Sequence, residues 1–139
     1  MIIKINNPKK SWGIQVKIVG LNIYQVELPM KEGAYSWSNQ SFKSFDSTVV
    51  EIKTNQGILG YGEICPLGPS YLPAYAEGAR VGIKKLSKSL MGQNPSNLFK
   101  INSIMDQSLK GHPYVKSAID IACWDILGKI TNQPVYNLL

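Results

Sequence analysis

The clearest hydrophobic pattern lies near the end of the chain, between Lys116 and Lys129 and in the residues beside them. Apolar side chains recur there at intervals of three and four residues, which places them on one face of a helix. The pattern therefore predicts an amphipathic helix. Its apolar stripe consists of Val115, Ile119, Ala122, Ile126 and Ile130.

The other positions of this helix suggest how it packs. Small residues, including Ala118 and Ala122, would let a neighbouring backbone approach closely. Asp125 precedes Lys129 by four residues, the favourable order for an exposed ion pair on a helix. Asp120 and Asp125 lie about 140° apart around the helix axis, so the two carboxylates cannot share one metal ion.

Three segments in the first half of the chain have the composition of strands. Lys17 to Leu28, Asp46 to Thr54 and Ile58 to Cys65 are rich in β-branched and aromatic residues. Pro29 ends the first segment, and a turn at Gly57 joins the second to the third. These segments predict a three-stranded antiparallel meander.

Two loops are expected beside these strands. Met30 to Phe45 mixes small polar residues with four aromatic ones and has no consistent period, so we expect a loop that covers an apolar surface or closes over a ligand. Pro66 to Pro73 contains three prolines and is expected to be stiff, which would hold Tyr71 in one place. From these residues alone, packing of Tyr71 on the next helix is the simpler interpretation.

Two further helices are expected between the strands and the last helix. Ala74 to Leu90 carries apolar residues on one face and is capped by Gly92, and another helix begins at Asn94-Pro95. The second helix has apolar residues at helical spacing, namely Leu98, Ile101, Met105 and Leu109. The predicted fold class is therefore α+β: a three-stranded antiparallel meander followed by a three-helix bundle.

Composition narrows the functional classes. The chain has 139 residues and a net charge of +6, but part of the excess lies in the first fifteen residues, and the other lysines are scattered. We therefore expect no nucleic-acid partner.

No apolar run approaches the roughly 18–20 residues of a membrane span, so a soluble, cytoplasmic protein is expected. Cys65 and Cys123, far apart in apolar contexts, are expected to be buried free thiols.

The residues show no catalytic constellation. His112 is the only histidine, and its place between Gly111 and Pro113 favours a structural role in a turn. No phosphate-binding loop, dinucleotide fingerprint or nucleophile elbow is present in the sequence. We therefore expect neither a catalytic residue nor a metal ligand in this chain.

A motif in the last helix nevertheless resembles that of a known family, the mandelate racemase/muconate lactonizing branch of the enolase superfamily. The chain differs from the usual pattern at Val115, where the family commonly has alanine. The matching residues are Asp120, Ala122, Trp124, Asp125, Gly128, Lys129, Pro134, Val135, Leu138 and Leu139.

The resemblance implies a domain organisation. Residues 16–139 would be the N-terminal capping domain, residues 1–15 an extension, and the (β/α) barrel that follows in the family would be missing here. In the family the barrel holds Mg²⁺ and the basic lysines that remove a proton next to a carboxylate. The 139-residue chain alone would then be inactive, and its barrel-facing apolar surface would make it self-associate.

A closer likeness implies a substrate. Several stretches resemble the caps of cis-3-hydroxy-L-proline dehydratases and of the related hydroxyproline-betaine 2-epimerases. By this resemblance Tyr71, Tyr35 and Trp37 would bind a proline derivative, and the reaction would be dehydration or, alternatively, epimerisation. A stand-alone, non-catalytic binding domain is the third possibility. The stretches are Glu32 to Ser38, Asp46 to Ile52, Gly60 to Gly68, Tyr71 to Pro73 and Gly111 to Tyr114.

Overall fold

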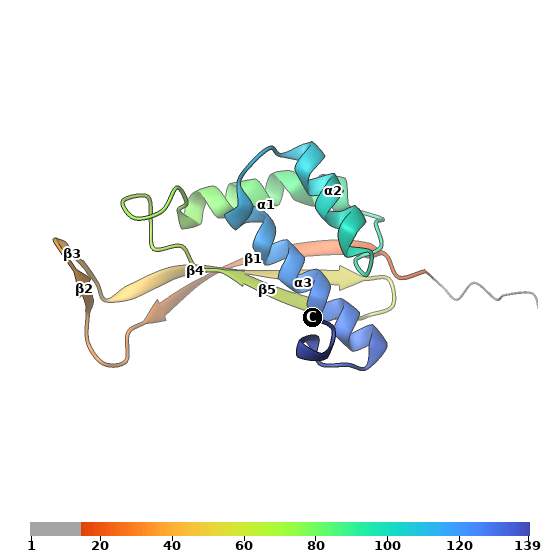
Figure 1. Cartoon of the computed structure of the whole chain (residues 1–139), viewed down its shortest axis with the longest axis horizontal. Coiled ribbons are helices and arrows are strands. Elements are labelled where there is room, and N and C mark those ends of the chain that lie inside the picture. The colour runs from red at the N-terminus through yellow and green to blue at the C-terminus, as the bar shows by residue number, and fades with distance from the viewer. Residues whose placement is uncertain (1–14) are drawn as a thin grey trace, which may run out of the picture.

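A computed structural model of the chain describes residues 15–139 (Figure 1). Three helices lie on one face of a three-stranded antiparallel sheet with strand order β1-β4-β5, and a two-stranded hairpin, β2-β3, projects from one end. The strands are β1 (Ile18–Pro29), β2 (Tyr35–Trp37), β3 (Gln40–Phe42), β4 (Ser44–Thr54) and β5 (Leu59–Ile64). The helices are α1 (Ala76–Leu90), α2 (Leu98–Ser108), α3 (Pro113–Thr131) and the 3-10 helix η1 (Val135–Asn137).

The predicted α+β class, with a meander followed by three helices and no closed barrel within residues 15–139, is confirmed. One hydrophobic core fills the space between the helices and the sheet. Both the central strand β4 and all three helices contribute to it. Its fully buried members include Val50, Ile52, Ile83, Leu86, Leu90, Ile101, Met105, Ile119 and Ile126.

Strand β5 lies close against α3. A Cβ atom on Gly60 would collide with the backbone carbonyl oxygen of Ala122, and one on Gly62 would collide with that of Ala118. Glycine at these two strand positions is therefore needed for this approach. The predicted close approach at Ala118 and Ala122 is confirmed.

Polar side chains of α3 cover the outer edge of β5. The Asp125 carboxylate accepts a hydrogen bond from the Tyr61 amide at 2.9 Å, and Lys129 Nζ donates to the Leu59 carbonyl at 2.8 Å. Lys129 and Asp125 also form the predicted ion pair, at 2.6 Å. The pair therefore satisfies backbone groups that an edge strand would otherwise expose.

The prediction of a loop throughout Met30 to Phe45 is wrong. Residues 35–37 and 40–42 pair as the β2-β3 hairpin, and β4 begins at Ser44. The pairing is supported by contacts across the two strands: Ser36 Oγ donates to Ser41 Oγ at 3.0 Å, and the Trp37 and Phe42 rings stack. These cross-strand contacts, which sequence periodicity does not reveal, outweigh the low strand propensity of serine.

Two burial predictions are also wrong. Ile130 is 38% exposed, because Lys129 already reaches Leu59, the first residue of β5, so Ile130 lies past the end of the strand. Cys65 is exposed because it follows the last residue of β5, where the chain leaves the sheet. Cys123 is buried as predicted.

The helices begin at different residues from those predicted. Helix α1 starts two residues later than expected, at Ala76, and α3 starts three residues earlier than Lys116, at Pro113. Helix α2 starts at Leu98, because the Asn97 side chain accepts a hydrogen bond from the Lys100 amide at 3.1 Å and caps the helix. The predicted extension, residues 1–15, falls almost wholly outside the described residues and stays a prediction.

Candidate functional site

Five aromatic side chains gather at the end of the sheet from which the hairpin projects. We call Tyr35, Trp37, Phe42, Phe45 and Tyr71 the aromatic cluster. Ring centroids are 5.5 Å apart for Tyr35 and Trp37, 5.6 Å for Trp37 and Tyr71, and 4.7 Å for Trp37 and Phe42. Phe45 lies 5.7 Å from Phe42 and 6.2 Å from Tyr35, so the contacts run through all five rings.

The structure brings together the three residues predicted to bind substrate. Tyr35 and Trp37 come from β2, whereas Tyr71 comes from the Pro66–Pro73 loop between β5 and α1. Tyr35 is 48% exposed and Tyr71 is 59% exposed, so much of each ring faces outward. A surface patch of partly exposed aromatic rings is unusual for a side chain cluster that serves only the core.

Local hydrogen bonds fix both parts of the cluster. The amides of Tyr71 and Leu72 donate to the Gly68 carbonyl at 3.1 and 3.0 Å, closing a turn. Gly68 has a φ of +103°, a conformation that favours glycine. At the base of the hairpin, the Met30 amide donates to the Lys43 carbonyl at 2.9 Å. The turn and the hairpin base therefore determine where the two groups of rings meet.

An ion pair anchors α1 to β4 near the cluster. The two guanidinium nitrogens of Arg80 lie 2.8 and 2.9 Å from the two carboxylate oxygens of Asp46, and Arg80 also donates to Thr48 at 3.3 Å. This fork is the geometry in which arginine binds carboxylates best. The hydrogen bonds from Arg80 hold the pKa of Asp46 below its usual value. Sequence reasoning missed this pair, because 34 residues separate its members.

A second polar network lies on the sheet face away from the helices. Glu51 is largely buried and accepts hydrogen bonds from Asn22 Nδ2 at 2.8 Å and from the Tyr61 hydroxyl at 3.0 Å. Lys53 lies 3.5 Å from the same carboxylate. Because Asn22, Glu51 and Tyr61 are direct cross-strand neighbours, the network joins β1, β4 and β5 and has a structural role.

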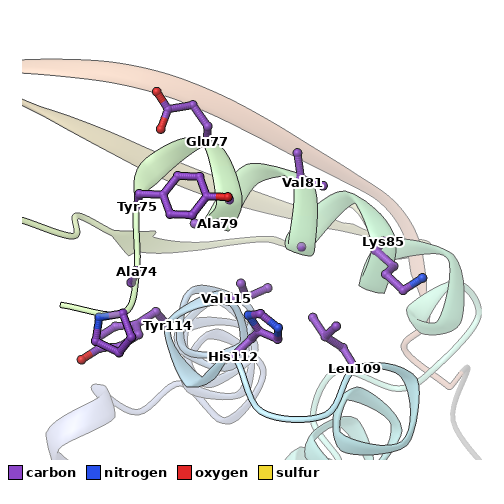
Figure 2. Close-up of a pocket in the computed structure, with 13 residues that line it drawn as sticks. Ala74, Tyr75, Glu77, Ala79, Val81, Lys85, Leu109, His112, Tyr114 and Val115 are labelled. Atoms are coloured by element: carbon purple, nitrogen blue, oxygen red, sulfur yellow. The ribbon is translucent and has the colours of Figure 1, made fainter. Parts of the chain in front are cut away.

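A groove of about 390 Å³ separates α1 from the start of α3 (Figure 2). Val81 in α1 and Tyr75, the residue before α1, line one side of the groove. The opposite side is lined by Leu109, His112 and Val115. His112 adopts a left-handed conformation, with φ of +52°, at the start of α3. Its backbone carbonyl accepts the Val115 amide at 3.0 Å, and a structural role for the His112 side chain stays a prediction.

Comparison with known proteins assigns the fold to a family. Residues 17–139 match the family described as mandelate racemase/muconate lactonizing enzyme, N-terminal domain. The chain belongs to this family. The predicted resemblance to the enolase superfamily is thus confirmed.

Several relatives of this N-terminal domain are enzymes. The chain is 57% identical over 125 residues to a cis-3-hydroxy-L-proline dehydratase of Roseibium aggregatum, an alignment that covers 89% of this chain and 34% of the relative. It is 37% identical to an N-succinyl-L-Arg/Lys racemase of Bacillus cereus, over 89% of this chain and 33% of that one. The chain spans about a third of the length of these curated relatives.

Solved structures agree with this family assignment. An enolase-superfamily member from Roseovarius nubinhibens is 45% identical, with a TM-score of 0.77 over 84% of this chain and 31% of the solved chain. The N-succinyl Arg/Lys racemase from Bacillus cereus is 36% identical, with a TM-score of 0.81 over 90% of this chain and 33% of its own. Another Roseovarius nubinhibens structure, 44% identical with a TM-score of 0.77 over 84% of this chain and 31% of its own, is described as complexed with magnesium.

The N-terminal domain itself does not fit a magnesium site. Within residues 15–139, no three His, Cys, Asp or Glu side chains gather closely enough to hold a metal ion. Asp120 accepts a hydrogen bond from Asn102 at 2.6 Å, whereas Asp125 binds the Tyr61 amide and Lys129. Each carboxylate therefore has its own partners on a different side of α3.

Among residues 15–139, no helix is long and apolar enough to cross a membrane.

Proposed function

We propose that this chain caps the active site of an enolase-superfamily enzyme that dehydrates cis-3-hydroxy-L-proline. The identity of 57% to a cis-3-hydroxy-L-proline dehydratase, over 89% of the chain, carries this proposal. The aromatic cluster supports it, because Tyr35, Trp37 and Tyr71 meet at one exposed surface.

In the proposed reaction, the Cα–H and Cβ–OH bonds of the substrate break. A Cα=Cβ double bond forms, and the proton and hydroxyl leave as water. Negative charge develops on the substrate when the proton next to its carboxylate is removed. This charge must be stabilised, and Mg²⁺ supplies that stabilisation when it is bound. We place its ligands and the proton-transfer residues in a barrel outside this chain, so the 139-residue chain alone would be inactive.

The role proposed for the capping domain is to bind the ring and to exclude water. The apolar carbons of a pyrrolidine ring pack well on the faces of Tyr35 and Tyr71. A cationic ring nitrogen over an aromatic face gains about 0.5–2 kcal/mol. Closing the aromatic surface over the site would also strengthen every charge interaction inside it.

The proposed barrel partner would cover the exposed side of α3 and the residues after it. Ile121, Tyr136 and Leu139 are 48%, 79% and 86% exposed. Tyr61, Trp124 and Val135 help to line a hollow beside them. A large apolar surface of this kind favours association, so self-association of the chain alone stays a prediction. A cytoplasmic location without nucleic-acid partners completes the proposal.

The alternative reaction is epimerisation of proline betaine or hydroxyproline betaine. It is supported by relatives that are a racemase and, at 34% identity, a hydrophobic dipeptide epimerase of Enterococcus faecalis. Both reactions begin with removal of the Cα proton. They are distinguished by analysing the product that the full-length enzyme forms from each substrate in deuterated water: dehydration removes the β-hydroxyl, whereas epimerisation keeps every substituent and inverts Cα with deuterium bound there. A stand-alone binding domain would instead bind a proline derivative without any barrel.

Substitution of Tyr71 tests the site. In the full-length enzyme, Tyr71→Ala should lower kcat/KM for cis-3-hydroxy-L-proline by about tenfold, since a loss of about 1.4 kcal/mol in the transition state is tenfold in rate. Phe99→Ala is the matched control, because Phe99 is 86% exposed on α2 and makes no ring contact among the described residues. Unchanged kinetics for Tyr71→Ala would remove this residue from the site.

A further inference from the structure

We infer that Phe42 is a positioning residue: it holds Trp37 against Tyr71 and thereby fixes the β2-β3 hairpin on the Pro66–Pro73 loop. The consequence for substrate binding rests on the proposed function. The docking of the hairpin on the loop does not depend on the proposed function, and this docking can be measured without any substrate.

The ring geometry points to Phe42 as the support of Trp37. The two rings are nearly parallel, with an interplanar angle of 7° and centroids 4.7 Å apart. Trp37 in turn meets the Tyr71 ring edge-on, at 68° and 5.6 Å. Offset-stacked and edge-to-face pairs are the favourable aromatic arrangements. Trp37 also lies 5.5 Å from Tyr35, so three ring contacts hold it, two within the hairpin and one to the loop.

The hairpin is joined to the main sheet through its base and through Phe45, and to the Pro66–Pro73 loop through Trp37. Strands β2 and β3 form a sheet of their own, separate from β1-β4-β5, with three residue pairs. An isolated two-stranded hairpin is only marginally stable in water. Among the ring contacts of residues 15–139, only that between Trp37 and Tyr71 joins the hairpin to the Pro66–Pro73 loop.

The rings of the cluster differ in exposure, and Trp37 is half-buried like Phe42 and Phe45. Tyr35 and Tyr71 are about half exposed, whereas Phe42 and Phe45 are less exposed. Phe42 also contacts Phe45 in β4, at 5.7 Å, so it connects Trp37 to the main sheet. This arrangement gives Phe42 a role through Trp37 and leaves Tyr35 and Tyr71 to face a ligand.

The test uses Trp37 as its own reporter. Trp12 and Trp124 are replaced by phenylalanine, which leaves Trp37 as the single tryptophan of the chain. Acrylamide quenching of its fluorescence then measures how often Trp37 leaves the cluster. Loss of one aromatic pair should change the equilibrium between the docked and undocked hairpin by about two- to tenfold. We therefore expect Phe42→Leu to raise the quenching constant above that of the parent with Trp37 alone, with unchanged far-UV circular dichroism.

Three further variants make the test specific. Phe42→Met places a flexible apolar side chain there without the ring, so it should behave as Phe42→Leu and replaces that variant if Phe42→Leu fails to fold. Phe42→Tyr restores a ring that can stack and should restore the parent's quenching constant. Phe99→Leu, the same change at the exposed site on α2, should leave quenching unchanged. The inference is overturned if neither Phe42→Leu nor Phe42→Met raises quenching, or if Phe42→Tyr is quenched as strongly as they are.

Turnover by the full-length enzyme separates this inference from the proposed function. Phe42→Leu should lower kcat/KM for cis-3-hydroxy-L-proline, and Phe42→Tyr should restore it. If quenching responds as expected and turnover does not, Phe42 positions the hairpin but the cluster does not serve this substrate. That result would sustain the positioning role and contradict the proposed function.

Discussion

Replacement of Gly62 by alanine tests the contact that positions α3 on the sheet. The new Cβ atom would collide with the Ala118 carbonyl oxygen and would lie 2.8 Å from the Ala122 nitrogen. Both neighbours are backbone atoms inside a helix, so neither can rotate away, and α3 must shift from β5. Inserting a methyl group into a packed core costs about 1–3 kcal/mol. We expect a cost at the upper end of this range, about 3 kcal/mol.

The assay is thermal unfolding followed by circular dichroism. For a domain of this size, each kcal/mol shifts Tm by about 3–6 °C, so Gly62→Ala should lower Tm by about 10 °C or more. Gly20→Ala is the matched control in β1, because its Cβ atom would meet only the Lys53 side chain at an ordinary distance of 3.7 Å. If both variants melt within about 2 °C of the parent, steric exclusion at Gly62 does not hold α3 in place.

Two further predictions concern titratable groups. Arg80 lowers the pKa of Asp46 in the folded state, so this ion pair stabilises the fold above about pH 4 and its contribution is lost as the pH falls further. Asp46→Asn should therefore flatten the acid decline of Tm measured between about pH 2 and 5, and an unchanged slope would contradict this. Burial raises the pKa of Cys123 to about 12, whereas Cys65 is exposed. A thiol reagent at neutral pH should thus label only Cys65 until denaturant is added; rapid labelling of both would disprove it.

Local sequence patterns predicted the regular elements where one face is buried. The apolar stripe of α3 is buried at Val115, Ile119, Ala122 and Ile126, as its period indicated. The turn at Gly57 has the expected positive φ, +76°. These features follow from the chain's own neighbours, because a helix or strand with one apolar face has one way to bury it. The α+β class could therefore be derived before the structure was known.

Element ends and the short hairpin could not be predicted in this way. Ile130 is not buried because β5, the strand beneath α3, extends no further than its first residue, Leu59, a limit set by β5 and not by α3. Each strand of the β2-β3 hairpin has only three residues, too few to show a consistent period, and the hairpin is supported by the Ser36–Ser41 hydrogen bond and by ring stacking. The exposure of Ile130 and the pairing of the hairpin both depend on contacts with residues outside the local segment.

The sequence by itself determined which faces are apolar, where the turns fall and which rings lie in segments without a helical or strand period. Only the tertiary structure decided that Trp37 and Tyr71, 34 residues apart, meet at 5.6 Å, and that Arg80 reaches Asp46. The physical reason is that a periodic pattern specifies burial but not a partner. Distant side chains meet only where backbone packing, such as the glycine-lined contact between β5 and α3, sets the elements at one distance and angle.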